Sequence, residues 1–318
     1  MGVFVYLPLV LPLTALPMAR LAEQHLHPRS ATRLLAAVGS TLALCSTLCL
    51  ALLMVVGTAQ LPGNPLPDGW SDPEVRAAVP YEEKAGLIAI GVLGAVLVAC
   101  GGTLLRHVRT RIGAARALPA STGGESDLAV VPSPDPYAYA LPGGRRRGGL
   151  VVVSTGMLDV LDARERRALV AHERAHLAGR HHRYLLVTQL AARANPFLLP
   201  LRTAVAYSTE RWADEEAAYA VGSRRAVATA VGKAALLSHR PPGPAVLPAF
   251  AASTPTGPVP RRVAALLDPE PSARLWPPPS AHLVLAAVTA TVGTAASALS
   301  SLSATVTLVG ILHAATPL

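Results

Sequence analysis

Four long apolar stretches constrain the fold of this chain more than any other feature. They cover residues 3–19, 34–57, 85–105 and about 282–315. A helix of about 20 apolar residues can cross a hydrocarbon core of about 30 Å, and it satisfies its own backbone groups there. The stretches therefore predict a mainly α-helical, polytopic membrane protein with about four transmembrane helices. The last stretch has room for two short spans, but we expect one.

The composition supports this interpretation. Hydrophobic residues make up 51% of the 318 residues and charged residues 15%, and the mean hydropathy is +0.40, which is more apolar than a usual soluble protein. A signal peptide is the alternative for residues 3–19, but no basic residue precedes them and Arg20 is the first. The net charge of +9 is not arranged as a basic stripe with interleaved aromatic residues, so we expect no nucleic-acid partner.

Charges in the loops predict the orientation of the spans. Residues 20–33 carry an excess of arginine, whereas residues 58–84 carry more acidic than basic residues, and arginine dominates again after the third span. Cytoplasmic loops carry the excess of Arg and Lys. We therefore expect the N-terminus and residues 58–84 outside the cell, and residues 106 to about 280 in the cytoplasm.

The expected cytoplasmic region contains the heptad VAHERAH, which includes the pattern HExxH from His172 to His176. Residues four apart on a helix lie on one face, about one turn apart, so both imidazoles can reach the same metal ion. A helix is predicted here because Asp162 and Glu165 have the spacing of a capping box and Gly179 is a C-terminal stop signal.

A catalytic zinc site needs a third protein ligand and an open position for water. Glu210 lies in the segment STERWADEEAA, with Asp214 four residues later, and small residues would let this helix approach the first one closely. We expect Glu210 to complete the site for one Zn²⁺, and Asp214 to accept the N–H of a ligand imidazole. The alternative is a solvated acidic face, because Glu215 and Glu216 follow.

Residues 106–134 are predicted to be a linker, since much of this segment is rich in Pro, Gly and Ser. Residues 137–141 and 149–154 then predict two strands joined by a turn. The edge of such a sheet could hold an extended substrate by strand addition, or the strands could only cover the HExxH helix. Residues 184–201 are apolar but interrupted by prolines, which favours two short helices at the membrane surface.

These motifs resemble the integral-membrane zinc peptidases of the M48 and M56 families, the latter including the BlaR-type antibiotic-sensing proteins of bacteria. The resemblance covers about residues 135–268. Its motifs are PYAYALPG (136–143), VVVSTGML (151–158), ALVAHERAHLAGRHH (168–182), ERWAD (210–214) and PRRVAALL (260–267). Three spans before the peptidase and one after it suit the M56 arrangement better.

The resemblance implies a cytoplasmic α+β zincin-like (gluzincin) peptidase domain, residues 135–275, inserted between the third and fourth spans. The membrane regions would then be residues 1–105 and 281–318. It also implies residue roles. The zinc ligands would be His172, His176 and Glu210. Glu173 would be the catalytic base, and Asp214 would support a ligand imidazole.

Arg262 matches the arginine of the last family motif, and it either reaches the active site or forms a structural ion pair. The donor that stabilises the oxyanion is not identified by the sequence, and Arg262, Tyr207 and His181 are the candidates. His181 and His182 are otherwise expected to form a polar helix end or a hydrogen bond to a metal ligand.

The resemblance further implies a metalloendopeptidase of the bacterial cell membrane, with its active site on the cytoplasmic side. Its substrate would be a cytoplasmic or membrane-proximal protein or peptide, such as a transcriptional repressor in a signalling pathway. The alternative is a non-catalytic membrane signalling protein that uses the zinc domain as a binding scaffold. A transporter is disfavoured because the spans carry no acidic residue. The sequence does not define the oligomeric state.

Overall fold

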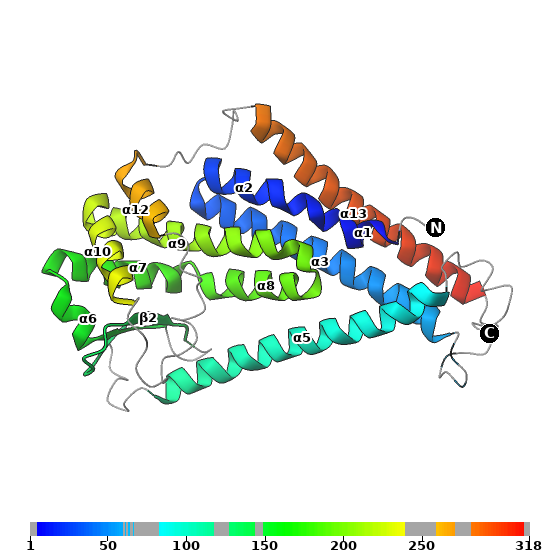
Figure 1. Ribbon diagram of the computed structural model, residues 1–318, viewed down its shortest axis with the longest axis horizontal. Helices are drawn as coiled ribbons and strands as arrows, with labels where there is room; N and C mark the ends of the chain where they lie inside the picture. The colour runs from blue at the N-terminus through cyan, green and yellow to red at the C-terminus, as the bar shows by residue number, and fades with distance from the viewer. Residues whose placement is uncertain are drawn as a thin grey trace.

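The structure is a computed structural model, and it describes residues 5–59, 61, 63, 66, 83–117, 127–143, 149–238, 259–270 and 281–314. It is mainly helical, with long helices packed along one another and a small sheet at one end of the molecule (Figure 1). The predicted fold class is confirmed at this level: a mainly α-helical protein with helices that can cross a membrane.

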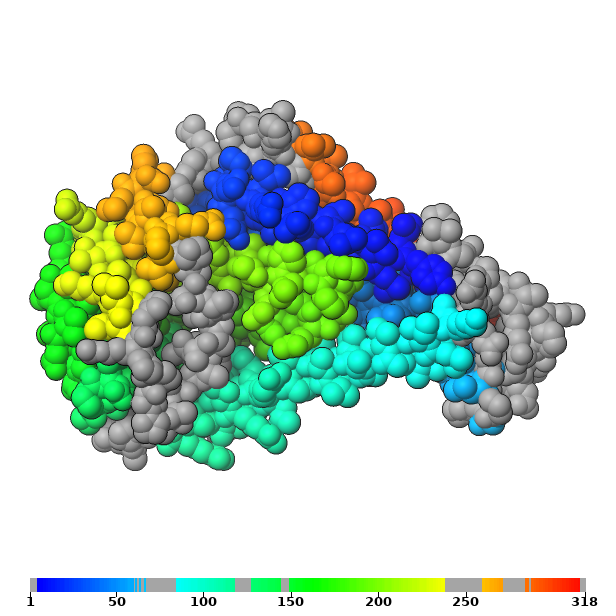
Figure 2. All heavy atoms as spheres, in the orientation of Figure 1, coloured from blue at the N-terminus to red at the C-terminus, as the bar shows by residue number. Residues whose placement is uncertain are grey.

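Three described helices are long and apolar enough to cross a membrane. They are α3 (Pro28–Thr58), α5 (Glu83–Arg116) and α13 (Ala281–Ala314). Apolar side chains along α5, such as Leu97 and Val98, are exposed, and this helix lies open along one edge of the molecule in Figure 2. Lipid would cover such a surface. The C-terminal stretch is one helix, as expected.

The first apolar stretch differs from the continuous span we expected. It is divided into α1 (Leu7–Val10), the 3-10 helix η1 (Leu11–Thr14) and α2 (Ala15–His25), and it is not among the candidate spans. The reason is Pro12, which has no N–H to donate to the carbonyl of Pro8 one turn before it. Three membrane crossings therefore have a candidate helix among the described residues, and the fourth stays a prediction.

Side chains from other helices satisfy the backbone that this break leaves free. Ser46 Oγ on α3 donates to the Pro8 carbonyl at 2.6 Å, and Asn195 Nδ2 donates to the Leu9 carbonyl at 3.1 Å and to Ser46 Oγ at 3.0 Å. Backbone groups within a membrane need such partners, because water is absent. The broken segment is thus held against the bundle by hydrogen bonds as well as by packing.

The predicted break within residues 184–201 is present, but the prediction of two short helices at the membrane surface is wrong. The chain forms α8 (His181–Ala194), a short 3-10 turn η4 (Pro196–Leu198) and then α9 (Leu199–Val221), which runs without a break into the ERWAD segment. Pro200 does not interrupt α9, because it lies in the first turn, where no intrahelical N–H partner is needed. Both helices pack against α3, and they share a hydrophobic core with it and with α2.

The sheet has three strands, β1 (Leu128–Val131), β2 (Ala138–Leu141) and β3 (Leu150–Ser154), in the order β1-β3-β2. The two predicted strands are present and pair antiparallel, whereas β1 pairs with β3 in parallel. We expected β1 to be part of a linker. The linker prediction is also wrong at its start, because α5 continues as a helix to Arg116.

Four further helices surround the sheet end of the molecule. They are α6 (Thr155–Val160), α7 (Ala163–Ala178), α10 (Arg224–Ser238) and α12 (Val259–Leu267). The capping box at the start of α7 is confirmed: Asp162 Oδ1 accepts from the Glu165 N–H at 2.8 Å, and Glu165 Oε2 accepts from the Asp162 N–H at 2.9 Å. Because α7 packs on β2, β3 and α9, its residues His172, Glu173 and His176 face the interior of this end.

Candidate metal centre

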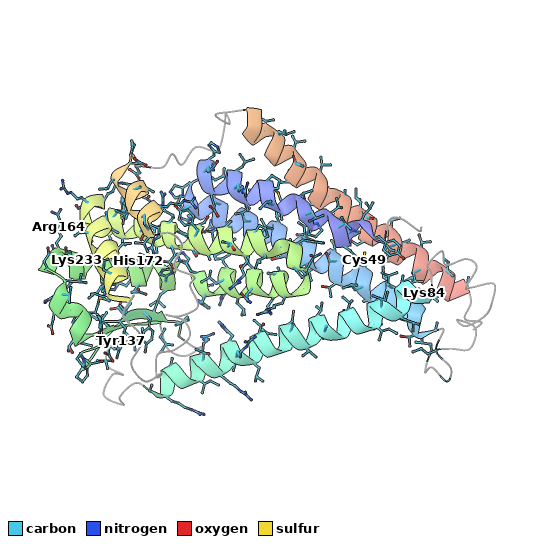
Figure 3. All side chains as sticks on the ribbon, viewed as in Figure 1. Cys49, Lys84, Tyr137, Arg164, His172 and Lys233 are labelled. Carbon is cyan, nitrogen blue, oxygen red and sulfur yellow. The ribbon has the colours of Figure 1, made fainter. Side chains whose placement is uncertain are left out.

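Three side chains from two helices bring ligand atoms together. The Nε2 atoms of His172 and His176 on α7 are 3.1 Å apart. Glu210 on α9 places its carboxylate oxygens 3.6 Å from the first of these nitrogens and 3.5 Å from the second. This is the His-His-Glu group predicted from the sequence, and it could hold a metal ion. Figure 3 shows His172 at the end of the molecule that carries the sheet, far from Cys49 and Lys84.

The close approach of α7 and α9 depends on small residues. Ala213 and Ala217, on α9 near Glu210, are fully buried, and Ala217 belongs to the same core cluster as Ala168 of α7. A larger side chain at these positions would push the helices apart and would separate the carboxylate from the imidazoles. The alanines that follow Glu210 in the sequence are thus part of the reason that the site forms.

The outer nitrogen of each imidazole also has a partner. His172 Nδ1 lies 3.0 Å from Asp214 Oδ1, and Asp214 is fully buried. His176 Nδ1 lies 2.9 Å from His181 Nδ1 at the start of α8. These contacts fix the two rings so that their Nε2 atoms converge toward Glu210.

Arg262 lies in this cluster although it is distant in sequence. From α12 it donates to both oxygens of Asp214, at 2.8 and 2.7 Å, and its Nη1 lies 2.9 Å from Glu210 Oε2. Only 8% of the residue is exposed. Arg262 therefore forms a buried ion pair with Asp214, and it also contacts the candidate ligand Glu210.

The sequence left several roles open for His181, and the structure places it against the ligand His176. His181 is buried, and its ring lies 4.5 Å from the Trp212 ring, measured between centroids. Gly179 provides the space: a Cβ there would lie 2.3 Å from His181 Nε2. The helix stop at Gly179 was recognisable, but no sequence pattern showed that its missing side chain makes room for an imidazole. Tyr207, the third candidate for the oxyanion donor, instead lies beneath the guanidinium of Arg261 at 4.4 Å.

Glu173 lies in the same interior but is not one of the three converging groups. Burial raises the pKa of Glu173 to about 7, while the charges of His172 and Arg262 and a backbone hydrogen bond from Ala140 on β2 work in the other direction. A carboxylate with a pKa near neutrality can both accept and release a proton.

The pKa values of the two imidazoles shift in opposite directions, and the pKa of the Glu210 carboxylate is lowered. Burial lowers the pKa of His172, but the hydrogen bonds to Asp214 and Glu210 outweigh it and raise the pKa to about 10. For His176, burial dominates and lowers the pKa to about 4. Burial raises the pKa of Glu210, but the charge of Arg262 and the neighbouring imidazoles hold it well below its usual value. The carboxylate is thus ionised and able to bind a cation.

A family model described as Peptidase family M48 matches residues 110–194. The matched segment covers less than half of the chain; it contains the whole HExxH pattern and ends before Glu210. The match supports the M48 part of the resemblance and indicates a metallopeptidase, whereas the M56 arrangement stays a prediction. Neither a curated protein nor a solved structure matches the chain.

Proposed function

We propose that this protein is an integral-membrane, zinc-dependent metalloendopeptidase that cleaves a cytoplasmic or membrane-proximal protein. The observation that carries the proposal is the convergence of His172, His176 and Glu210 beside Glu173. Two imidazoles and one carboxylate form a common catalytic zinc ligand set, which leaves a fourth position for water. Because the pKa of His172 is raised, metal binding must release a proton from its imidazole.

The spacing of the ligand atoms fits zinc. Ligands at about 2.0–2.2 Å from a tetrahedral ion lie about 3.3–3.6 Å from one another. The three separations here are 3.1, 3.5 and 3.6 Å. Coordination through Nε2 requires the proton of each imidazole to be on Nδ1, and Asp214 and His181 lie where they would accept it.

The proposed reaction is hydrolysis of a peptide bond. Zinc, when bound, supplies Lewis acidity toward the scissile carbonyl and acidifies water. Glu173 accepts the proton of the attacking water and passes it to the leaving amine nitrogen. Asp214 and His181 hold the two imidazoles in place, while Arg262 keeps Asp214 and Glu210 ionised.

The edge of the sheet supports an extended peptide as substrate. Among the described residues, β2 pairs only with β3, so its other edge is open to an added strand. Ala140 of β2 makes a backbone hydrogen bond to Glu173. A peptide that pairs with β2 would therefore pass directly by the catalytic base.

The proposal includes a bacterial cell membrane, a cytoplasmic active site and a signalling substrate such as a repressor, as in an M56-type arrangement. The arginine excess on one side of the spans supports the orientation, and the three apolar helices support the membrane. The substrate and its place in signalling rest on the resemblance alone.

The test separates metal binding from catalysis. Glu173→Gln should keep the metal in detergent-solubilised protein but abolish cleavage, whereas Glu210→Ala should lose the metal and the cleavage together. Asp159→Asn, at an exposed acidic residue on α6 outside the cluster, is the matched control and should change neither. Metal content is measured by mass spectrometry, and cleavage by comparing the protein fragments of cells that carry wild type or Glu173→Gln.

Two outcomes would contradict the proposal. If Glu210→Ala retained one tightly bound metal ion, the ligand set would be wrong. If wild type and Glu173→Gln bound zinc equally and produced the same fragments, the protein would be a non-catalytic zinc scaffold.

A further inference from the structure

A cavity separate from the candidate metal ligands lies against the end of α7. It has a volume of about 680 Å³ and lies between the start of α3, the end of α7, the start of α8 and the middle of α9. Four arginines line it together with Trp212. Arg29 and Arg33 belong to α3, Arg183 belongs to α8, and Arg180 immediately precedes α8. We call this the arginine cavity. None of its four arginines takes part in the catalytic cluster.

The charge of the arginine cavity is not balanced by the part of the chain that the structure describes. The four arginines have no carboxylate partner among the described residues. Arg29 and Arg33 instead place their guanidinium carbons 5.5 Å from the centroid of the Trp212 ring. The only acidic side chain in the described lining is Glu216, which accepts a hydrogen bond from Trp212 Nε1 at 3.0 Å. Four guanidinium groups around one cavity favour an anion as its ligand.

The backbone at this place supports the same ligand chemistry. Arg180 is the only described residue other than glycine with a positive φ, at 52°, and it precedes α8 without a side-chain cap. Arg180 and Arg183 of the lining flank the first residues of α8, where the helix dipole has its positive end. Strained backbone of this kind is found at ligand sites more often than elsewhere.

The position in the molecule distinguishes a lipid from a soluble anion. Arg29 and Arg33 are in the first two turns of α3, immediately before its apolar stretch begins at Leu34. The cavity continues along that stretch past Ala37 and Ser40 of α3 and past Val187 of α8. A basic end at the membrane surface and an apolar end along a span match a phosphate headgroup with its acyl chains.

We propose that the arginine cavity binds the phosphodiester headgroup of an anionic phospholipid, with the acyl chains along α3 and α8. Recognition is by guanidinium–phosphate hydrogen bonds, which a zwitterionic lipid weakens because its cationic group is repelled. The three candidate metal ligands do not line this cavity, so lipid binding can be measured separately from the proposed peptidase activity.

The experiment measures lipid binding to the full-length protein. Detergent-solubilised protein is titrated with phosphatidylglycerol or with phosphatidylcholine of the same acyl chains, and bound lipid is counted by native mass spectrometry. Wild type should prefer phosphatidylglycerol. Replacing both Arg33 and Arg183 by Gln should weaken its binding by about 30-fold, because guanidinium–phosphate hydrogen bonds from two arginines are lost. Arg183→Gln alone, which disturbs no described contact, should weaken it by about 5-fold.

The matched control removes two arginines elsewhere at the same end of the spans. Arg106 and Arg109 are exposed on α5 and do not line the cavity, so their double Gln variant should bind phosphatidylglycerol as wild type does. An equal loss in this control would overturn the proposal in favour of general surface attraction. So would equal binding of both lipids to wild type. Displacement of the lipid by millimolar inorganic phosphate, with direct phosphate binding, would assign the cavity to a soluble anion instead.

Discussion

The residues around His176 show how much a metal site depends on groups that do not touch the ion. His176 is oriented by His181, and His181 fits only because residue 179 has no side chain. The histidines of HExxH were predictable because helical periodicity alone places them on one face. The His181 contact was only one of several alternatives, because it depends on the left-handed backbone of Arg180, which no sequence pattern shows.

Gly179→Ala should therefore weaken metal binding without removing a ligand. A Cβ at this position would lie 2.3 Å from His181 Nε2, so the ring must move and His176 loses its partner. Changes of such outer partners typically reduce metal affinity about 10- to 100-fold. Competition with a chelator of known affinity measures the change. Gly232→Ala on α10, where a Cβ would meet nothing within 4 Å, is the control. An unchanged affinity in Gly179→Ala would show that the His181 contact does not hold His176.

Arg262 shows what the sequence contributed through family resemblance and what only the fold could add. The motif PRRVAALL marked the residue, but 48 positions separate it from Asp214. Its pairing with Asp214 and Glu210 follows from the packing of α12 against α9 and α10. A buried arginine beside two carboxylates balances charges that would otherwise be unpaired in the interior.

At the scale of elements, the predictions succeeded where a local pattern determines the structure. The capping box, the helix stop and the two strands near residues 137–154 all depend on neighbours in sequence. They failed at β1, whose four residues carry no alternation and whose pairing with β3 is long-range. They also failed at Pro200. The sequence does not show whether a proline lies in the first turn of a helix, where it is tolerated, or in the interior, where it breaks the helix.

The crossing of α3 and α5 depends on two glycines. A Cβ on Gly57 would lie 2.4 Å from the Gly86 carbonyl carbon, and a Cβ on Gly86 would lie 2.6 Å from Gly57 Cα. Backbone atoms cannot move aside as a flexible side chain can, so the helices must separate. Close approach at small residues is a main source of helix association in membranes.

We expect Gly57→Ala to destabilise the protein by about 1–3 kcal/mol, the usual range for overpacking. Thermal unfolding in detergent measures the effect. The control is Gly94→Ala on α5, where a Cβ would meet nothing within 4 Å and the substitution should be tolerated. Equal unfolding temperatures for wild type and Gly57→Ala would mean that α3 and α5 do not cross at these glycines.

At the scale of the whole molecule, the membrane helices and the metal helices form one packed body. The α8–α9 pair that leads to Glu210 shares its core with α2 and α3, and Asn195 between them bonds to Ser46 halfway along α3. We expected a peptidase domain separated from the membrane region by a linker. Sequence periodicity could not show this shared core, because the apolar face of α8 is compatible with a lipid surface as well as with another helix.

The arrangement of the spans predicts which ends share a side of the membrane. The end of α5, the start of α3 and the start of α13 lie toward the end of the molecule that carries the metal cluster (Figure 1). The end of α3 and the end of α13 lie toward the other. Because the arginine-rich segments belong to the first group, we expect that group in the cytoplasm.

Reporter fusions test this orientation directly. A fluorescent protein fused after Ala117, just beyond α5, should be fluorescent, and alkaline phosphatase at the same position should be inactive. After Ala59, just beyond α3, phosphatase should be active and the fluorescent protein dark. A fusion after Ala314 should behave like the one after Ala59, since α13 crosses once; the opposite result there would mean that α13 does not span. A reversal at all three positions would keep the metal cluster intact but place it outside the cell, and a cytoplasmic substrate would then be excluded by topology alone.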